Sequence, residues 1–298
     1  MDKLLKLLSE TKYATLIQNV EEITINGYKI PNLFKITTKD NRYFSFKIRS
    51  IDKYNITDSI EILKSIVNQS ELLVGYNDVV LQGNNYILIS EWIDGIQPIS
   101  SDRENLPLYF KELALFNKSN ICEGPFTSMY LDGKRFETIE EMISFEFNNH
   151  IQYYEGKHSH NYIKDQIKYL LNGIGCLIIE DMNTGNMIMN KLKNIIFIDM
   201  DYLSKGLNIY QFDHINLMKF NKSEWWNITA EAKNCLNSYF QTLGVSKNEA
   251  IKQIKSYYIF SILRNISYQK WNKCYINYDK VDENIEQIVS INKLEYFP

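Results

Sequence analysis

The feature that most constrains the fold is the stretch from residue 176 to 201, which holds three short apolar runs, each beside a carboxylate or an amide. The first run leads to Asp181, a turn brings Asn186 to the second run, and the third run leads to Asp199. Apolar runs of this length between turn residues are typical of buried strands. We therefore predict a small hairpin with these polar side chains converging at one edge.

The polar residues at the ends of these runs are of the types that bind metal ions and take part in phosphoryl transfer. Burying strands that end in carboxylates is costly unless a positive group such as a metal ion meets them. Asp181, Asn186 and Asp199 supply hard oxygen ligands and a base, which a magnesium-dependent phosphoryl-transfer site needs. The spacing also fits a plain hairpin with turn-forming residues, because Asp279 and Asn284 have the same offset in a tail without strand signal. The offset alone does not decide between these interpretations.

Composition and charge limit the class of protein. The 298 residues are 45% hydrophobic and 23% charged, which is ordinary for a globular protein that buries its core in one large domain or two lobes. The formal net charge of −3 argues against a protein whose main role is non-specific nucleic-acid binding. We expect no nucleic-acid partner.

Cysteines and hydrophobic segments bear on the compartment. The four cysteines are widely spread and form no Cys-x-x-Cys pair, so neither a zinc site nor a disulfide framework is predicted, and we expect reduced, buried thiols. The first ten residues are too charged for a signal peptide, and no stretch approaches the roughly 18 apolar residues of a membrane span. We expect a soluble, cytoplasmic protein with no membrane partner.

The first part of the chain is strand-like. Apolar and polar residues alternate over 43–49, which places Lys47 in the middle of a strand and on its polar face. A single lysine in that position is usually a solvated residue on an exposed sheet face. Turn residues punctuate the strand-like region of residues 15–49 at 26–27, 31–32 and 40–41.

A helix is predicted after this region. Thr57 or Asp58 can cap it, and its apolar residues fall on one face. Glu61 lies near the edge of that face, where its carboxylate could pair with Lys64 on the surface or reach across to Lys47.

The remaining segments predict an α+β protein. Two more strands are expected at 79–82 and 86–90, and the pattern then turns helical. We predict a strand-rich N-terminal lobe over residues 1–93, a hinge or linker over 94–100, and a mostly helical C-terminal lobe over 101–298 that holds the hairpin. The predicted helices cover residues 101–117, 138–154, 160–171, 223–242, 247–267 and 281–291.

Six segments of the chain follow one another in an order that, taken as a whole, indicates a family resemblance. They are the strand lysine Lys47, the helix glutamate Glu61, the hinge-like segment 89–95, the helical segment 111–116, the catalytic-loop-like segment 180–186 and the metal-loop-like segment 198–201. Taken together, they resemble the aminoglycoside phosphotransferase and choline kinase-like branch of the protein-kinase-like fold. The match covers most of the chain.

The resemblance implies a bilobal fold with a small antiparallel-sheet N-lobe and a larger, mostly helical C-lobe. It also implies transfer of the γ-phosphate of ATP, or GTP, to a hydroxyl of a small molecule such as an amino sugar or amino alcohol. Lys47 would hold the nucleotide phosphates and be oriented by Glu61. The backbone of Glu91, Trp92 and Ile93 would meet the adenine ring.

The resemblance also assigns roles in the hairpin region. Asp181 would accept the proton of the substrate hydroxyl or orient that hydroxyl, while Asn186 and Asp199 would hold Mg²⁺. Asp201 is an alternative or second ligand, and Asp213 matches a helix-start aspartate that braces the catalytic loop. These parts meet the demand of phosphoryl transfer for positioning and for neutralisation of phosphate charge.

The sequence departs from the family pattern at two places. Ile179 and Glu180 stand where family members usually carry a His and often a Gly, and a carboxylate next to Asp181 would tend to raise one pKa. No Gly-x-Gly-x-x-Gly loop is present, and the corresponding turn is predicted at 26–32 with Gly27 alone.

Two alternatives to a small-molecule kinase follow. A catalytically weak, kinase-like protein that binds nucleotide or a partner is motivated by Ile179, Glu180 and the poor glycine loop. A protein kinase is less favoured, because no activation segment ending in Ala-Pro-Glu lies between Asp199 and Asp213.

Overall fold

The computed structural model describes residues 8–25, 28–51, 56–66, 72–97, 103–127, 134–180, 182, 184–212 and 230–290. The fold is α+β, as predicted. The chain divides into two compact units, the first made of residues 1–97 and 186–203, the second of residues 98–185 and 204–298. The segment that follows the predicted catalytic loop thus belongs to the same unit as the N-terminal strands.

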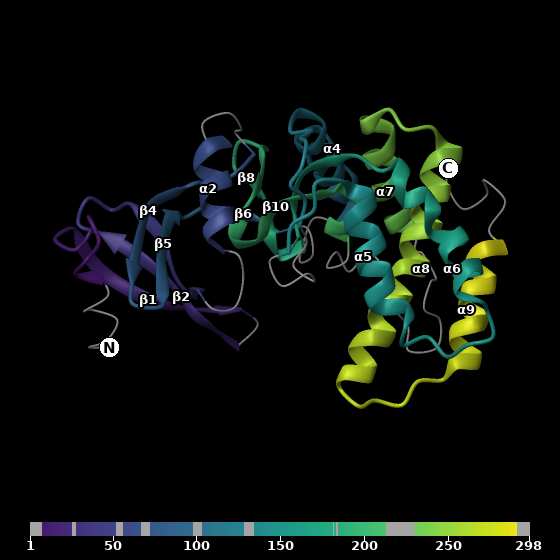
Figure 1. Ribbon diagram of the computed structural model, residues 1–298. Helices are drawn as coiled ribbons and strands as arrows, with labels where there is room; N and C mark the ends of the chain where they lie inside the picture. The colour runs from purple at the N-terminus through teal and green to yellow at the C-terminus, as the bar shows by residue number, and fades with distance from the viewer. Residues whose placement is uncertain are drawn as a thin grey trace. The chain divides into compact units, whose positions relative to one another are not determined.

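A five-stranded antiparallel sheet forms the core of the first unit, with strand order β1-β2-β3-β5-β4 (Figure 1). One face of the sheet packs with Leu8 and Tyr13 into a hydrophobic cluster. The alternation predicted for β3 is confirmed, since Phe44 and Phe46 are buried in that cluster. The strands are β1 (Ile17–Ile25), β2 (Tyr28–Thr38), β3 (Tyr43–Ser50), β4 (Tyr76–Gln82) and β5 (Asn85–Glu91).

The start of β2 differs from the predicted turn. Residues 28–32 lie inside the strand, and Asn32 has a positive φ of 60° beside a shift in the register of β1 on β2. Pro31 has no N–H to give to a ladder, so the proline and asparagine form an irregularity within the strand instead of ending it. Asn26 and Gly27 lie outside the described residues.

The predicted hairpin is present in the first unit. β8 (Met187–Asn190) pairs antiparallel with β9 (Ile195–Phe197), and β6 (Gly95–Ile96) adds to the other edge of β8. The first apolar run also forms a strand, β7 (Gly175–Ile179), but β7 pairs with β10 (Leu203–Leu207) in a separate two-stranded sheet. The prediction that all three runs share one hairpin is therefore wrong for the first run.

Helix α2 (Ile56–Ile66) matches the predicted helix of the first unit. Its apolar residues Ile60 and Leu63 are buried, and the helix packs on the short 3-10 turn η7 (Met200–Tyr202). Ser59 Oγ on the same helix donates to the carbonyl of Leu203, 2.9 Å away. These contacts fix which face of α2 points inward.

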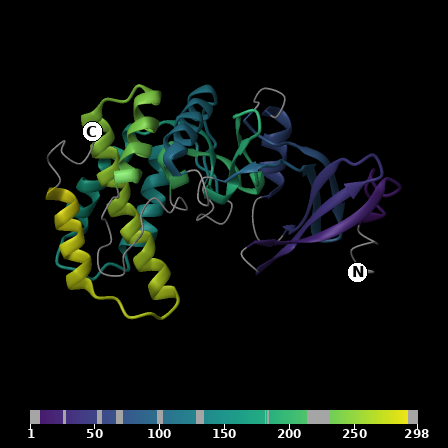
Figure 2. The same ribbon diagram turned by 180° about the vertical axis from the view of Figure 1, so that it is seen from behind.

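The second unit is mostly helical. α5 and α8 lie side by side in both views (Figures 1 and 2). Thr138 caps α5 through a reciprocal capping box with Glu141. No helix in the described ranges is long and apolar enough to cross a membrane. The helices are α4 (Leu106–Ser119), α5 (Ile139–Ile151), α6 (His160–Ile167), α7 (Ala230–Leu243), α8 (Lys247–Trp271) and α9 (Tyr278–Ser290), and residues 223–229 of the predicted segment lie outside the described residues.

The cysteines are free thiols, as predicted. Cys176 and Cys235 are buried and Cys122 is half-buried, whereas Cys274 is exposed. The expectation that all the thiols are buried is thus wrong for Cys274, because this residue follows the end of α8 and packs against no core.

A buried ion pair ties α5 to α8. The Oε1 atom of Glu146 lies 2.5 Å from Nη2 of Arg264, and Tyr210 Oη donates to Oε2 over 3.0 Å. Glu146 is 1% exposed. Burial acts to raise the pKa of Glu146, but the positive charge of Arg264 and the contact with His150 outweigh it, so the pKa lies below its ordinary value.

Glu146→Gln is expected to lower the free energy of unfolding by about 3–5 kcal/mol, because Arg264 would keep its buried charge without a counter-charge. Since the folded-state pKa of Glu146 is lowered, the wild-type contribution is present above the unfolded pKa of about 4.3 and is lost as the pH falls through the folded value. Urea unfolding from neutral to acid pH measures both effects.

The matched control is Glu140→Gln on the exposed first turn of α5, which is expected to change stability by less than about 0.5 kcal/mol. Equal stability of Glu146→Gln and the wild type at neutral pH would contradict the assignment of this pair as a stabilising contact between the two helices.

Candidate active site

Asn186 and Asp199 lie at the same end of the β8–β9 hairpin. Met187 is paired with Phe197, so the residues just before β8 and just after β9 are neighbours. The Ile198 N–H donates to the carbonyl of Asn186 over 2.9 Å. Asn186 is buried, whereas the side chain of Asp199 keeps 26% of its surface exposed. Strand pairing thus brings an amide and a carboxylate to one hairpin end, as the sequence predicts.

Asp199 has an unusual backbone conformation. Its φ of 62° and ψ of 60° place it in the left-handed region, which residues other than glycine seldom adopt. Such a conformation is less favourable by about 1–3 kcal/mol and persists where the surroundings hold it, often at functional sites. At Asp199 it turns the chain directly from β9 into η7.

Lys47 projects from the polar face of β3 toward this carboxylate. Its Nζ atom forms an ion pair with Asp199 Oδ1 and lies 2.7 Å from Oδ2 of Asp201. The lysine side chain is 13% exposed, so it is a largely buried cation and not the solvated surface lysine that its isolated pattern allows. The structure therefore brings together Lys47, Asp199 and the hairpin end.

Asp201 is held by two further residues that sequence reasoning did not single out as functional. Arg49 Nε donates to Asp201 Oδ2, and Tyr76 Oη donates to Oδ1 over 2.8 Å. Asp201 is 3% exposed. A signal for Arg49 was present, since it lies two residues beyond Lys47 on the polar face of the same strand. The sequence carries no comparable signal for Tyr76.

The two carboxylates of this cluster are electrostatically unequal. Burial raises the pKa of Asp199, and the charge of Asp201 adds to that effect. Burial acts in the same direction on Asp201, but Lys47 and Arg49 outweigh it and its pKa is lowered. Burial and Asp201 also raise the pKa of Tyr76 well above its ordinary value. Asp199 is therefore the carboxylate whose charge is less fully compensated and which an added cation would stabilise.

Glu61 is not brought to Lys47. Its side chain is exposed on α2, and no ion pair links it to Lys47 among the described residues. The inward face of α2 carries Ser59 instead, through its bond to the Leu203 carbonyl.

The hinge-like segment 89–95 begins in the last residues of β5 and continues beyond the strand. The Trp92 N–H donates to the carbonyl of Tyr43 over 3.0 Å, so this donor is already used within the first unit. Because alternate residues of a strand bond to opposite sides, the backbone groups of Glu91 point away from β3. The Trp92 indole N–H donates to Asp94 Oδ1 over 2.9 Å.

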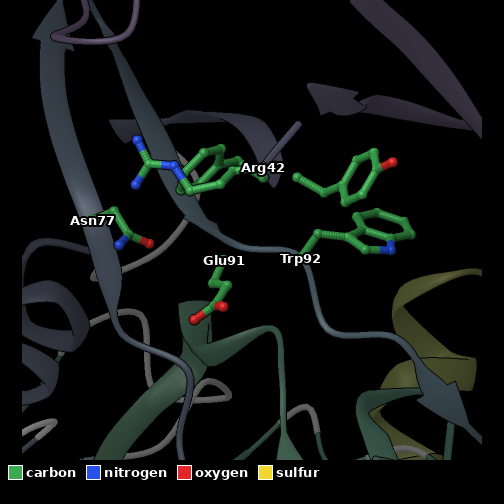
Figure 3. A pocket seen from close by; sticks show the side chains of 6 residues that line it. Arg42, Asn77, Glu91 and Trp92 are labelled. Carbon is green, nitrogen blue, oxygen red and sulfur yellow. The ribbon is translucent and has the colours of Figure 1, made fainter. Parts of the chain in front are cut away.

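A cavity of about 330 Å³ adjoins this segment within the first unit (Figure 3). Lys35 lies beside it, with its Nζ atom 4.5 Å from the ring centroid of Tyr43 and 4.7 Å from that of Trp92. The cavity thus combines aromatic surfaces with polar groups at the end of the sheet. It is lined by Arg42, Tyr43, Phe44, Asn77, Glu91 and Trp92.

Asp181 and Asp213 lie outside the described residues, but the residues just before Asp181 are described. Ile179 is fully buried at the end of β7. Glu180 is buried and accepts a hydrogen bond from Ser204 Oγ. Its carboxylate is thus engaged within the second unit.

A buried polar network holds β7 in the second unit. Asn117 Nδ2 on α4 donates to the Leu177 carbonyl of β7 over 2.8 Å. The Oδ1 atom of Asn117 accepts from Gln211 Nε2 and from Tyr239 Oη of α7, each over 2.7 Å. The network therefore fixes the strand that precedes Glu180 to two helices, and sequence patterns gave no sign of it.

The residues at the hairpin end have the chemistry for a magnesium ion. Carboxylate and amide oxygens are hard ligands, and Mg²⁺ at phosphoryl-transfer sites takes one or two carboxylates and completes its shell with water and substrate phosphates. Asn186 and Asp199 fit that kind of site. In the described part of the chain, no group of three or more His, Cys, Asp or Glu residues is placed to hold a metal ion.

No protein-family model and no curated protein sequence matches the chain. Several solved structures do match the chain. An aminoglycoside phosphotransferase from Alicyclobacillus acidocaldarius has a TM-score of 0.57 and 13% identity, covering 93% of this chain and 89% of that one. The Plasmodium vivax ethanolamine kinase has a TM-score of 0.56 and 15% identity, covering 96% and 85%.

A third match is a thermostable mutant of aminoglycoside phosphotransferase APH(4)-Ia in ternary complex with ADP and hygromycin B. Its TM-score is 0.57 and its identity 12%, covering 97% of this chain and 96% of that one. At these identities the matches establish the fold alone. The chain has the kinase-like α+β fold that these small-molecule phosphotransferases share, as the sequence resemblance implies.

Proposed function

We propose that this protein is an ATP-dependent phosphotransferase that moves the γ-phosphate to a hydroxyl of a small molecule. The observation that carries the proposal is the ion pair between Lys47 of β3 and Asp199 at the hairpin end. Each member has a partner in a magnesium nucleotide, because phosphate attracts the lysine and the metal attracts the carboxylate. A half-buried pair of charges held in this way is oriented for the metal and the phosphates before they bind.

Asn186 and Asp199 would hold the magnesium ion, which when bound neutralises charge on the phosphates. Lys47 would bind and orient the same phosphates. Support comes from the position of Asn186 beside Asp199 and from the incompletely compensated charge of Asp199.

Asp181 would accept the proton of the acceptor hydroxyl or orient that hydroxyl for attack. The neighbouring carboxylate of Glu180 is buried and bonded to Ser204, which supports assigning this role to Asp181. Asp213 would brace the loop that carries Asp181.

The base of ATP, or GTP, would lie against the segment from Glu91 to Ile93. Since the Trp92 N–H is bonded to Tyr43, the Glu91 carbonyl and the Ile93 N–H are the groups that would meet the ring. The adjoining cavity supplies room and aromatic surface for a planar ring. ADP bound in one structural neighbour supports nucleotide binding.

The acceptor class we propose is an amino sugar, an amino alcohol or a related metabolite in the cytoplasm. Structural neighbours are described as phosphotransferases for aminoglycosides, ethanolamine and fructosamine, which supports a small hydroxylated acceptor.

The test is phosphate transfer by the purified protein. Wild-type protein is incubated with magnesium and ATP, alone and with pools of amino sugars and amino alcohols, while ADP release and the mass of each acceptor are followed. We expect acceptor-dependent ADP release and one acceptor heavier by a phosphoryl group. Absence of both nucleotide binding and turnover would overturn the proposal, whereas binding without turnover under all pools would favour the regulatory alternative.

A further inference from the structure

The phosphate-binding lysine of the proposed site has a different carboxylate partner from the one that the sequence predicts. Glu61 on α2 is exposed, and no ion pair with Lys47 links it to the site among the described residues. The Oδ2 atom of Asp201 instead lies 2.7 Å from Lys47 Nζ. Asp201 comes from η7, directly after the hairpin end, and not from the helix.

Asp201 is fixed from two strands of the N-terminal sheet. Arg49 on β3 donates to Oδ2, and Tyr76 at the start of β4 donates to Oδ1 over 2.8 Å. The carboxylate is 3% exposed and its two oxygens already meet three donor groups. A carboxylate so engaged has little freedom to leave Lys47.

Asp199 differs from Asp201 in this respect. Its side chain is 26% exposed, and its closest cation is Lys47. If Asp199 turns to a metal ion, Lys47 loses one partner but keeps the other. Two carboxylates and two cations, Lys47 and Arg49, balance within the cluster, which a buried charge cluster requires.

We propose that Asp201, held by Arg49 and Tyr76, is the positioning residue for Lys47, in place of a glutamate on α2. The inference rests on the proposed function, in which Lys47 binds the nucleotide phosphates. It follows that the loop after the hairpin sets the position of the lysine, so that metal ligand and phosphate ligand are aligned by one segment of chain.

A double-mutant cycle on nucleotide affinity tests this. Affinity for AMP-PNP with magnesium is measured by calorimetry for wild type, Asp201→Asn, Lys47→Met and the double variant. We expect Asp201→Asn to weaken binding about tenfold in the wild type and less than about twofold in the Lys47→Met background, because a positioning residue acts through the group that it positions. An equal loss in both backgrounds would overturn the inference.

Glu61→Gln is measured in the same assay and is expected to keep the affinity within about twofold of the wild type. A tenfold loss that disappears in the Lys47→Met background would assign the role to Glu61 and overturn the inference. Arg135→Gln is the matched control for Arg49→Gln, because Arg135 is an exposed arginine that the proposed site does not use.

Milder variants guard against a failure to fold. Tyr76→Phe removes only the hydroxyl and is expected to weaken binding about threefold, and Arg49→Lys to recover part of the loss seen in Arg49→Gln. Circular dichroism checks the fold of each. No loss in Tyr76→Phe, Arg49→Gln and Asp201→Asn together would also overturn the inference.

A readout without nucleotide separates this inference from the proposed function. The NMR resonance of the Lys47 side chain, assigned by its absence in Lys47→Met, is expected to move in Asp201→Asn and to stay in Glu61→Gln. If the wild type binds no nucleotide, the proposed function fails while this comparison still decides which carboxylate holds the lysine. A resonance that moves only in Glu61→Gln would sink the inference.

Discussion

Asp199→Ala is expected to weaken the binding of magnesium nucleotide about a hundredfold, which corresponds to about 2.7 kcal/mol. The substitution removes the charged oxygen ligand that we propose for the metal, and among the described residues Lys47 keeps only Asp201 as its carboxylate partner. The loss of affinity should appear only when magnesium is present. Without the metal, the carboxylate at position 199 contributes nothing to nucleotide binding, and its removal takes away a negative charge that repels the phosphates. Calorimetry with AMP-PNP, with and without magnesium, measures both affinities.

Asn186→Ala is the companion variant at the same hairpin end. It should weaken magnesium-dependent binding in the same direction but less strongly, since a neutral amide is a weaker ligand than a carboxylate. If Asp199→Ala binds magnesium nucleotide as tightly as the wild type, Asp199 is no metal ligand and the hairpin end has a structural role only.

Asp181→Ala is expected to lower the turnover number by about three orders of magnitude, within the range for loss of a general base. Nucleotide affinity should stay within about twofold of the wild type, because in the proposed mechanism Asp181 acts on the acceptor hydroxyl and not on the nucleotide. Acceptor-dependent ADP release gives the turnover number, and calorimetry with AMP-PNP gives the affinity.

Glu180→Gln is the matched control, because this neighbouring carboxylate is bonded to Ser204 and glutamine can accept the same hydrogen bond. A large loss in Glu180→Gln together with a small loss in Asp181→Ala would show that the roles are reversed. Equal loss of folded structure in Asp181→Ala and Asp199→Ala, seen by circular dichroism, would support the interpretation of the region as a plain hairpin.

The parts of the site that sequence reasoning found are those fixed by local patterns. Alternation along β3 places Lys47 on the polar face whatever the rest of the chain does. The close pairing of β8 with β9 brings Asn186 beside Asp199, since a short hairpin leaves little choice of register. The order along the chain of the six segments that carry the resemblance then predicted the kinase-like fold.

The parts that sequence reasoning missed depend on long-range register. Tyr76 meets Asp201 across 125 residues and Arg49 meets it across 152, through strands whose pairing no local pattern specifies. The apolar sequence of β7 does not indicate which strand it pairs with, so its pairing with β10 was not predicted.

The inward face of α2 is set by the packing of Ile60 and Leu63, which turns Glu61 outward.

One spectroscopic measurement reports on the metal, the nucleotide and Asp199 together. Mn²⁺ replaces magnesium, AMP-PNP is added, and couplings from the nucleotide phosphorus to the bound metal are recorded by electron–nuclear double resonance. The proposed site predicts a protein-bound Mn²⁺ signal with phosphorus couplings in the wild type that Asp199→Ala abolishes while the fold is kept. No bound Mn²⁺ in the wild type, or the same signal in the variant, would contradict it.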